Sequence, residues 1–244
     1  MTYEPRTDRR VLLLRPAKYA KGDGYGAFGP DGDRLVEYWR KHGAVTQVRE
    51  IDVTAPDDHD PATPPSKGEM KTRFARTLAV LRGFSGDMPK DTLVIAAHGW
   101  RTGLQLGITT KNVGQFADAL IAAGLTVDAD IFLAACSAGD GAPTGDKSVA
   151  DELRDALAVR GHNWVTVYAH TTAGEAFRNP FVRVFTTGGQ KTPITGGTYL
   201  VAPKSRAFVP WRKAMGRKTP GPGGFLWCRF FDMGNDEIAA EIST

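Results

Sequence analysis

Short apolar runs alternate with segments of helical periodicity along the first two thirds of the chain. Apolar runs bounded by polar turns are typical of strands that are buried on both faces of a parallel sheet. Between these runs, apolar residues recur at intervals of three and four, as amphipathic helices require. We predict strands at residues 10–14, 44–51, 92–97, 130–135 and 163–169, and helices at residues 33–42, 68–83, 112–123 and 147–160.

This alternation of strand and helix predicts an α/β fold, in which a parallel sheet carries helices on both faces. After about residue 176 the rhythm changes: glycine, threonine and proline become frequent, and only short strands are indicated, near residues 198–201 and 225–231. We therefore expect residues 1–175 to form the core, and residues 176–244 to be a basic, loop-rich C-terminal extension of the same domain.

Two chemically reactive residues directly follow predicted central strands. His98 comes after the strand at 92–97, and Cys136 comes after the strand at 130–135. Ligands of open parallel sheets bind beyond the carboxyl ends of the strands, and a right-handed crossover brings such strands close together in one sheet. The sequence therefore predicts that His98 and Cys136 meet at one rim of the sheet.

A cysteine and a histidine in this arrangement suit nucleophilic catalysis. An adjacent imidazole can generate the thiolate, and it can then protonate a leaving amine. The backbone amides of Gly99 and Cys136 are candidate donors to a developing oxyanion. The competing interpretation is structural, because a cysteine after an apolar strand often serves as a small buried hydrophobe, and a His-Gly pair often only forms a turn.

With these residues the chain resembles the caspase-like cysteine peptidases: caspases, metacaspases, gingipain, clostripain, legumain, separase and the bacterial CHAT domains. Their shared signature is an apolar strand ending in His-Gly, followed by a second apolar strand ending in Ala-Cys or Gln-Cys. Residues 93–99 and 131–136 match it. The resemblance covers residues 8–175 and is greatest to the bacterial members.

The resemblance implies a three-layer α/β/α caspase-like sandwich with a mainly parallel central sheet. It also implies an endopeptidase that needs no cofactor or metal, with Cys136 as the nucleophile and His98 as the general base and acid. The Arg-Gly that follows the cysteine of animal caspases is absent here, so their aspartate specificity is not implied.

By the same resemblance, the preference for a peptide or protein substrate depends on three loops, at residues 18–33, 140–147 and 170–175. Asp140 and Asp146 are candidates to receive a basic side chain, and His170 is a candidate to line the site. Lys18, Lys21 or Arg34 could instead receive an acidic side chain. Both preferences stay open at this point.

Composition sets broader limits. The hydrophobic fraction of 41% and the charged fraction of 24% are ordinary for a soluble globular protein. We see no secretory signal and no apolar run long enough to span a bilayer, so we expect a cytoplasmic protein without a membrane partner. Two cysteines, Cys136 and Cys228, are too few for a disulfide framework or a cysteine zinc site.

The net charge of +4 is unevenly distributed, because residues 176–231 contain ten lysines and arginines and no acidic residue. Such a segment can face an acidic partner or nucleic acid, with Trp211 and Trp227 as stacking groups. A solvated surface and core packing of the tryptophans are the simpler alternatives, and we do not favour nucleic acid. Within this segment we predict a mobile loop at residues 213–224, a candidate for self-processing or for contact with an activating partner.

Several other interpretations compete with the peptidase. The same fold can serve as a binding or assembly module without turnover. Ser137 lies in a degenerate nucleophile elbow of the α/β-hydrolase type, although the elbow lacks its first glycine. Residues 24–29 match the glycine pattern of dinucleotide sites, but they lie far from the preceding strand. The acidic loop at residues 57–60 could hold a metal, and solvated charge is its simpler explanation.

Overall fold

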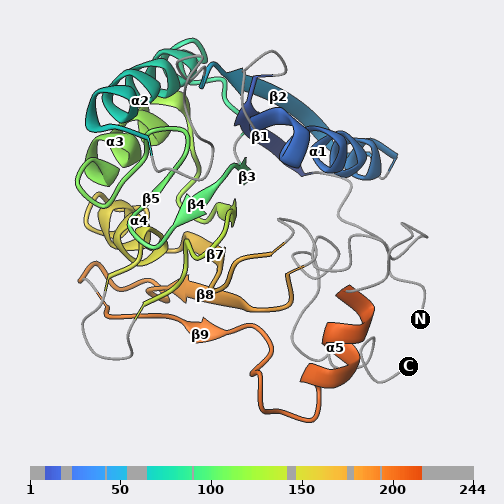
Figure 1. The fold of residues 1–244 in the computed structure, drawn as a ribbon. Helices are drawn as coiled ribbons and strands as arrows, with labels where there is room; N and C mark the ends of the chain where they lie inside the picture. Colours follow the sequence, from blue (N-terminus) through green and yellow to red (C-terminus); the bar gives the residue numbers. More distant parts are fainter. Residues whose placement is uncertain are drawn as a thin grey trace.

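A seven-stranded sheet organises the computed structural model, which describes residues 9–17, 24–41, 43–53, 65–89, 91–141, 147–174, 179–192 and 194–215 (Figure 1). The strand order is β2-β1-β3-β6-β7-β8-β9. The first five strands in this order are mutually parallel, and β8 and β9 are added antiparallel at one edge. The strands of the sheet are β1 (Arg10–Pro16), β2 (Val45–Ile51), β3 (Thr92–Ala96), β6 (Asp130–Ala134), β7 (Thr166–His170), β8 (Val182–Thr186) and β9 (Thr198–Tyr199).

Helices cover both faces of this sheet. On one face, α2 (Lys67–Arg82), α3 (Val113–Ala123) and α4 (Val149–Ala158) pack against the odd-numbered residues of β3 and β6. On the other face, α1 (Gly24–Lys41) and α5 (Phe208–Met215) pack against the even-numbered residues of the same strands. Figure 1 shows these two helical layers on opposite sides of the strands. The predicted α/β class with a mainly parallel sheet is confirmed.

The central strands are apolar because both of their faces are covered. Every residue of β3 is fully buried, and so are the four residues of β6 after Asp130. This double burial explains why these strands read as continuous apolar runs rather than as an alternating pattern. Among the described residues, no helix has the length and hydropathy needed to cross a bilayer.

The first helix differs from the prediction. We expected it to begin at Asp33, and α1 begins at Gly24, although Gly29, Pro30 and Gly32 all disfavour helix. Tertiary contacts account for the longer helix. The Arg15 guanidinium donates to the Gly29 carbonyl oxygen at 3.1 Å, and a Cβ at Gly32 would lie 3.2 Å from Arg15 Nη1. Glycine therefore lets the helix approach β1 closely, and packing outweighs local propensity.

The segment after residue 175 also contains more structure than its composition indicated. The prediction missed β8, which pairs with β7 along its whole length, and α5, whose Trp211 is fully buried. The strand expected at 198–201 is present as the shorter β9. Of the loop predicted at 213–224, the first three residues belong to α5, so the prediction is wrong there. The rest of that loop and the strand expected at 225–231 lie outside the described residues.

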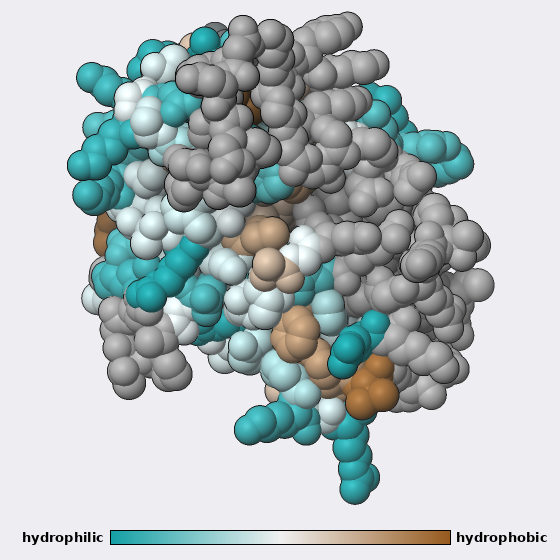
Figure 2. All heavy atoms as spheres, in the orientation of Figure 1, coloured by the Kyte–Doolittle hydropathy of each residue, from teal (hydrophilic) through white to brown (hydrophobic). Residues whose placement is uncertain are grey.

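The described surface is mostly polar, with an apolar area over the region of α5 (Figure 2). Val209 of α5 is 71% exposed, whereas Phe208 and Trp211 of the same helix are buried against the sheet. The helix is thus amphipathic, and its inner face joins the core on the side of α1.

A buried charge cluster fixes α4 to the loop that precedes β9. Arg154 is 1% exposed, and its guanidinium contacts Asp151 Oδ1 at 2.6 Å and Asp155 Oδ1 at 2.8 Å. It also donates to the carbonyl oxygens of Gly196, at 2.7 Å, and of Ile194. Burial raises the pKa of the Asp151 carboxyl, and the charge of Arg154 opposes this rise. Arg154 therefore compensates two buried carboxylates at once.

Replacing Arg154 with methionine should lower the free energy of unfolding by about 3–5 kcal/mol at pH 7, because two buried carboxylates lose their cation. A raised pKa in the folded state means that protonating Asp151 favours folding, and that this contribution is lost as the pH rises. The loss in the variant should therefore be smaller at about pH 4.5 than at pH 7. Urea unfolding at the two pH values measures both effects.

Arg160→Met is the matched control, since Arg160 pairs with Asp118 at 2.6 Å and the Asp118 side chain is 63% exposed. Loss of this surface pair should cost about 1 kcal/mol or less. Equal losses in the two variants would contradict the assigned role of the buried cluster.

Candidate active site

The pairing of β3 with β6 determines where His98 and Cys136 lie. Leu93 pairs with Ile131 and Ala96 with Ala134, in parallel register. The Ala97 amide then donates to the Ala134 carbonyl oxygen at 3.4 Å, so the pairing continues past the ends of the strands. His98 and Cys136 each lie two residues beyond the last pair, Ala96 and Ala134, where the chains leave β3 and β6. The sequence-predicted pair therefore lies on adjacent chains at one rim of the sheet.

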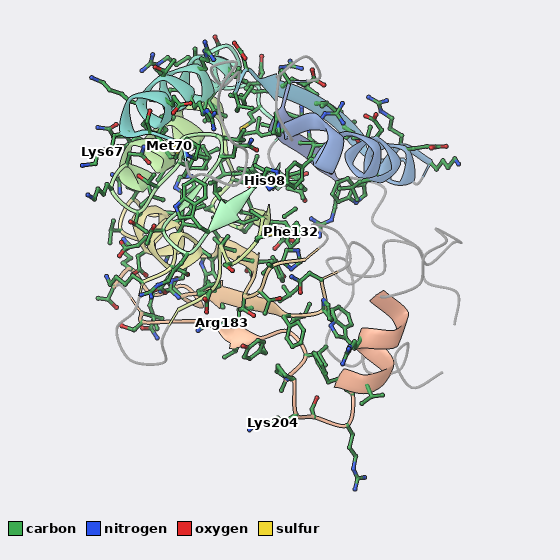
Figure 3. All side chains as sticks on the ribbon, in the orientation of Figure 1. Lys67, Met70, His98, Phe132, Arg183 and Lys204 are labelled. Atoms are coloured by element: carbon green, nitrogen blue, oxygen red, sulfur yellow. The ribbon has the colours of Figure 1, made fainter. Side chains whose placement is uncertain are left out.

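The His98 side chain lies on the face of the sheet that α1 covers. Side chains alternate between the faces of a sheet, and the even-numbered residues of β3 and β6 face α1. His98 follows β3, and its ring packs edge-on against Phe28 of α1, with 4.9 Å between ring centroids. Figure 3 shows His98 between β4 and α1. Cys136 lies in the turn after β6, so the alternation of the strand does not set the direction of its side chain.

Gly99 brings the chain after His98 into close contact with the chain around Cys136. A Cβ at Gly99 would lie 2.7 Å from Ala135 Cβ and 2.9 Å from the Cys136 carbonyl oxygen, distances that real side chains do not adopt. In the structure, the neighbouring Cys136 peptide occupies the space that a side chain would need.

A short hairpin of β4 (Gly99–Trp100) and β5 (Gly103–Leu104) holds the backbone of His98. The His98 amide donates to the Gln105 side-chain oxygen at 3.3 Å, and the Gln105 amide donates to the His98 carbonyl oxygen at 2.8 Å. The hairpin is in turn fixed to α2, where Thr77 Oγ1 donates to the Leu106 carbonyl oxygen at 2.8 Å. Gln105 thus positions His98 through two hydrogen bonds, and no sequence pattern pointed to it.

The chain turns sharply after Cys136. Ser137 adopts a φ of 53°, a left-handed conformation that is uncommon for residues other than glycine. The turn is anchored to the end of β7, since the Gly139 amide donates to the His170 carbonyl oxygen at 2.8 Å and the Ser137 amide donates to that of Thr172 at 3.3 Å. Cys136 is partly exposed, and its Sγ donates to the Gly174 carbonyl oxygen at 3.6 Å.

Asn179, which sequence analysis did not single out, organises the loop that faces the cysteine. It is 4% exposed, and its Nδ2 donates to the Thr172 carbonyl oxygen at 3.0 Å. Its Oδ1 accepts from the Phe181 amide at 3.0 Å. The Thr172 carbonyl oxygen therefore accepts hydrogen bonds from both Asn179 and Ser137. These two bonds connect the segment before β8 to the Cys136 turn. A buried asparagine in a loop has no periodic signal by which the sequence could have revealed it.

The remaining predicted residues contribute in different ways. His170 is 1% exposed, and its ring packs edge-on against Phe132 with 5.3 Å between ring centroids, so it packs beneath the rim rather than lining an open site. Asp140 is exposed near the Cys136 turn and is accessible to a ligand. Arg34 belongs to α1. Asp146, Lys18 and Lys21 lie outside the described residues.

The structure agrees with some features of the competing motifs and disagrees with others. The positive φ of Ser137 resembles the strained turn of a nucleophile elbow, but the elbow leads directly from a strand into a helix, and α4 begins only at Val149. Residues 24–29 form the beginning of α1, and Pro30 and Gly32, whose low helix propensity predicts an interruption there, lie inside the helix. Residues 24–29 still begin well beyond β1, whereas a dinucleotide fingerprint starts at the end of its strand. Residues 57–60 and Cys228 lie outside the described residues.

The geometry therefore joins a thiol, an imidazole and a tight backbone turn at the carboxyl ends of two adjacent parallel strands. Comparison with protein-family models, with curated proteins and with solved structures finds no match to this chain.

Gly99→Ala should disrupt this arrangement, because the added methyl group would overlap the Cys136 carbonyl oxygen. We expect a loss of about 1–3 kcal/mol in the free energy of unfolding and a change in the rate at which iodoacetamide alkylates Cys136. Chemical denaturation and mass spectrometry of the alkylated protein measure the two effects.

Gly68→Ala provides the control, since a Cβ there would have only Ser66 Oγ as a neighbour, at 4.0 Å, and the position is helical. This variant should be unchanged or more stable by up to about 1 kcal/mol, with unchanged alkylation. Wild-type behaviour of Gly99→Ala in both measurements would show that the close approach is wrong.

Proposed function

We propose that this chain is a caspase-like cysteine endopeptidase, in which Cys136 is the nucleophile and His98 is the general base and acid. One observation carries the proposal: β3 and β6 are adjacent parallel strands, and His98 and Cys136 follow their carboxyl ends at the same rim of the sheet. The three-layer arrangement with a mainly parallel sheet agrees with the caspase-like resemblance of the sequence.

In this mechanism His98 accepts the thiol proton, and Cys136 Sγ attacks the carbonyl carbon of the peptide bond. The tetrahedral intermediate collapses as His98 donates that proton to the leaving amine, which leaves a thioester on Cys136. Water, deprotonated by His98, then hydrolyses the thioester and restores the thiol. The contact with Phe28 and the paired hydrogen bonds from Gln105 restrict the orientation of His98, which favours each proton transfer.

The backbone near both residues supports an oxyanion site. His98 and Gln105 form a hydrogen-bonded pair, so the next pair of the hairpin, Gly99 and Leu104, is a non-bonded one whose amides point outward. The Leu104 amide accordingly donates to the Ile108 carbonyl oxygen, outside the hairpin. By the same pairing pattern the Gly99 amide is directed away from β5. It is therefore not used by the hairpin ladder and is a candidate donor to the oxyanion.

The charges around the cysteine favour neither substrate class alone. Asp140 is the exposed acidic group near the Cys136 turn, and it suits a basic substrate side chain. The neighbouring Lys147 contacts Glu152 of α4 at 3.6 Å, so its charge is partly compensated. We therefore propose peptide-bond hydrolysis as the reaction and keep the side-chain preference as a property to be measured.

The proposal predicts that the wild-type chain cleaves peptides and that Cys136→Ala does not. A diverse peptide library should be incubated with each protein, and the cleavage sites should be read by mass spectrometry. Cys136 should also be alkylated by iodoacetamide near neutral pH faster than a free thiol in a peptide, because a neighbouring imidazole stabilises the thiolate.

Ser137→Ala is the control, because it tests the hydrolase alternative at the next residue. It should retain cleavage and should not change labelling by a fluorophosphonate. If neither the wild type nor Cys136→Ala cleaves any peptide and Cys136 has ordinary reactivity, the proposal fails, and a binding module with this fold is the better description.

Gln105→Ala should reduce kcat/KM for any cleaved peptide by about tenfold, the effect of one lost hydrogen bond on the position of His98. Gln105→Glu keeps an oxygen that can accept from the His98 amide, so it should retain most of the activity lost in the alanine variant. Its added charge should raise the pKa seen in the pH profile, since a nearby carboxylate favours the imidazolium. Equal activity of wild type and Gln105→Ala would exclude the positioning role.

A further inference from the structure

A hollow lies at the antiparallel edge of the sheet, on the side of the extension. It is enclosed by β8, β9 and the loop at residues 194–197, with a volume of about 480 Å³. Its walls include backbone from glycines and four side chains with hydroxyl groups: Thr186, Thr195, Thr198 and Tyr199. These hydroxyl groups offer hydrogen bonds to a small polar ligand, beside the apolar side chains of Val184 and Ile194.

Arg183 is the charged side chain of this wall. It is 8% exposed, and Figure 3 shows it on β8 beside β9. Its Nη1 donates to the Gly139 carbonyl oxygen at 3.1 Å, while its Nε and Nη2 donate to that of Gly197 at 3.1 and 2.7 Å. The guanidinium also lies 5.0 Å from the centroid of the Phe185 ring. Phe185 and carbonyl oxygens therefore orient Arg183 at the wall of the hollow.

The charge of Arg183 has no carboxylate counterpart among the described residues. Asp151 and Asp155 of α4 are engaged by Arg154, and the exposed Asp140, which follows Gly139, makes no ion pair with Arg183. The chain itself offers few alternatives, since residues 176–231 contain no acidic residue. A nearly buried guanidinium without a paired anion is costly, and a bound anion would compensate it.

We propose that this hollow binds an anionic group, a carboxylate or a phosphate, through Arg183 and the surrounding hydroxyls. Each Nη atom carries two hydrogens, so donors remain beyond the bonds to Gly139 and Gly197. Planar guanidinium donors suit the oxygens of either anion. The site is separate from the proposed dyad, because Arg183 pairs with Ala169 on the α4 face, whereas His98 packs against Phe28 of α1. The proposal therefore does not depend on peptidase activity.

The experiment follows the melting temperature of the full chain during titration with inorganic phosphate or with acetate, with chloride keeping the ionic strength constant. We expect the melting temperature to rise saturably, by about 3 °C or more when the concentration of free anion is about ten times its Kd. Isothermal calorimetry under the same conditions gives the stoichiometry, which should be one anion per chain. A response to phosphate alone or to acetate alone identifies the source of the anion.

Arg183→Gln should abolish the rise, and Lys191→Gln should keep it, because Lys191 is an exposed cation of the same segment outside the wall of the hollow. Thr195→Glu is a second variant that distinguishes loss of the site from misfolding of Arg183→Gln. It retains the arginine and introduces a carboxylate at the wall, so it too should lose the response. No saturable response of the wild type to either anion would overturn the proposal, and so would an unchanged response in Arg183→Gln and Thr195→Glu.

Discussion

The constraint on which the rest of the site depends is the parallel register between β3 and β6. It pairs every residue of one strand with the residue 38 positions later in the other, from Thr92 with Asp130 to Ala96 with Ala134. Because the side chains of a strand alternate strictly, a shift of β6 by one residue would turn its side chains to the opposite face and displace Cys136 along the rim relative to His98. Burial of all of β3 and of the four residues of β6 after Asp130 prevents such a shift, since it would exchange the residues of the two cores.

Close backbone contacts then convert this register into a defined geometry. Gly99 touches the Cys136 peptide, and Gly107, at the end of the hairpin, leaves no room for a side chain against the Phe74 backbone of α2. The hairpin is thereby held between α2 and the cysteine turn, and Gln105 transmits this position to His98. Three elements that are distant in sequence thus determine the orientation of one imidazole.

On the opposite side of the Cys136 turn, two arginines connect the C-terminal extension to the core. Arg154 holds the loop at 194–197 to α4, and Arg183 holds the same loop to the carbonyl of Gly139. The turn after Cys136 is therefore connected to residues that begin the basic segment. This connection gives the extension a structural role in the core domain, and it places the proposed anion site close to the Cys136 turn without making it part of the proposed dyad.

The sequence by itself determined the alternation of strands and helices, the apolar central strands and the positions of His98 and Cys136 at strand ends. These features depend on local periodicity and on burial, which leave a direct mark on the order of residues. Only the tertiary structure decided the start of α1, the presence of β8 and the roles of Gln105, Asn179 and Arg183. Each of these depends on a contact between distant segments: Arg15 with the Gly29 carbonyl, β8 with β7, or a side chain with a backbone group of another loop. Such contacts satisfy individual polar groups and have no period, so the order of residues alone does not reveal them.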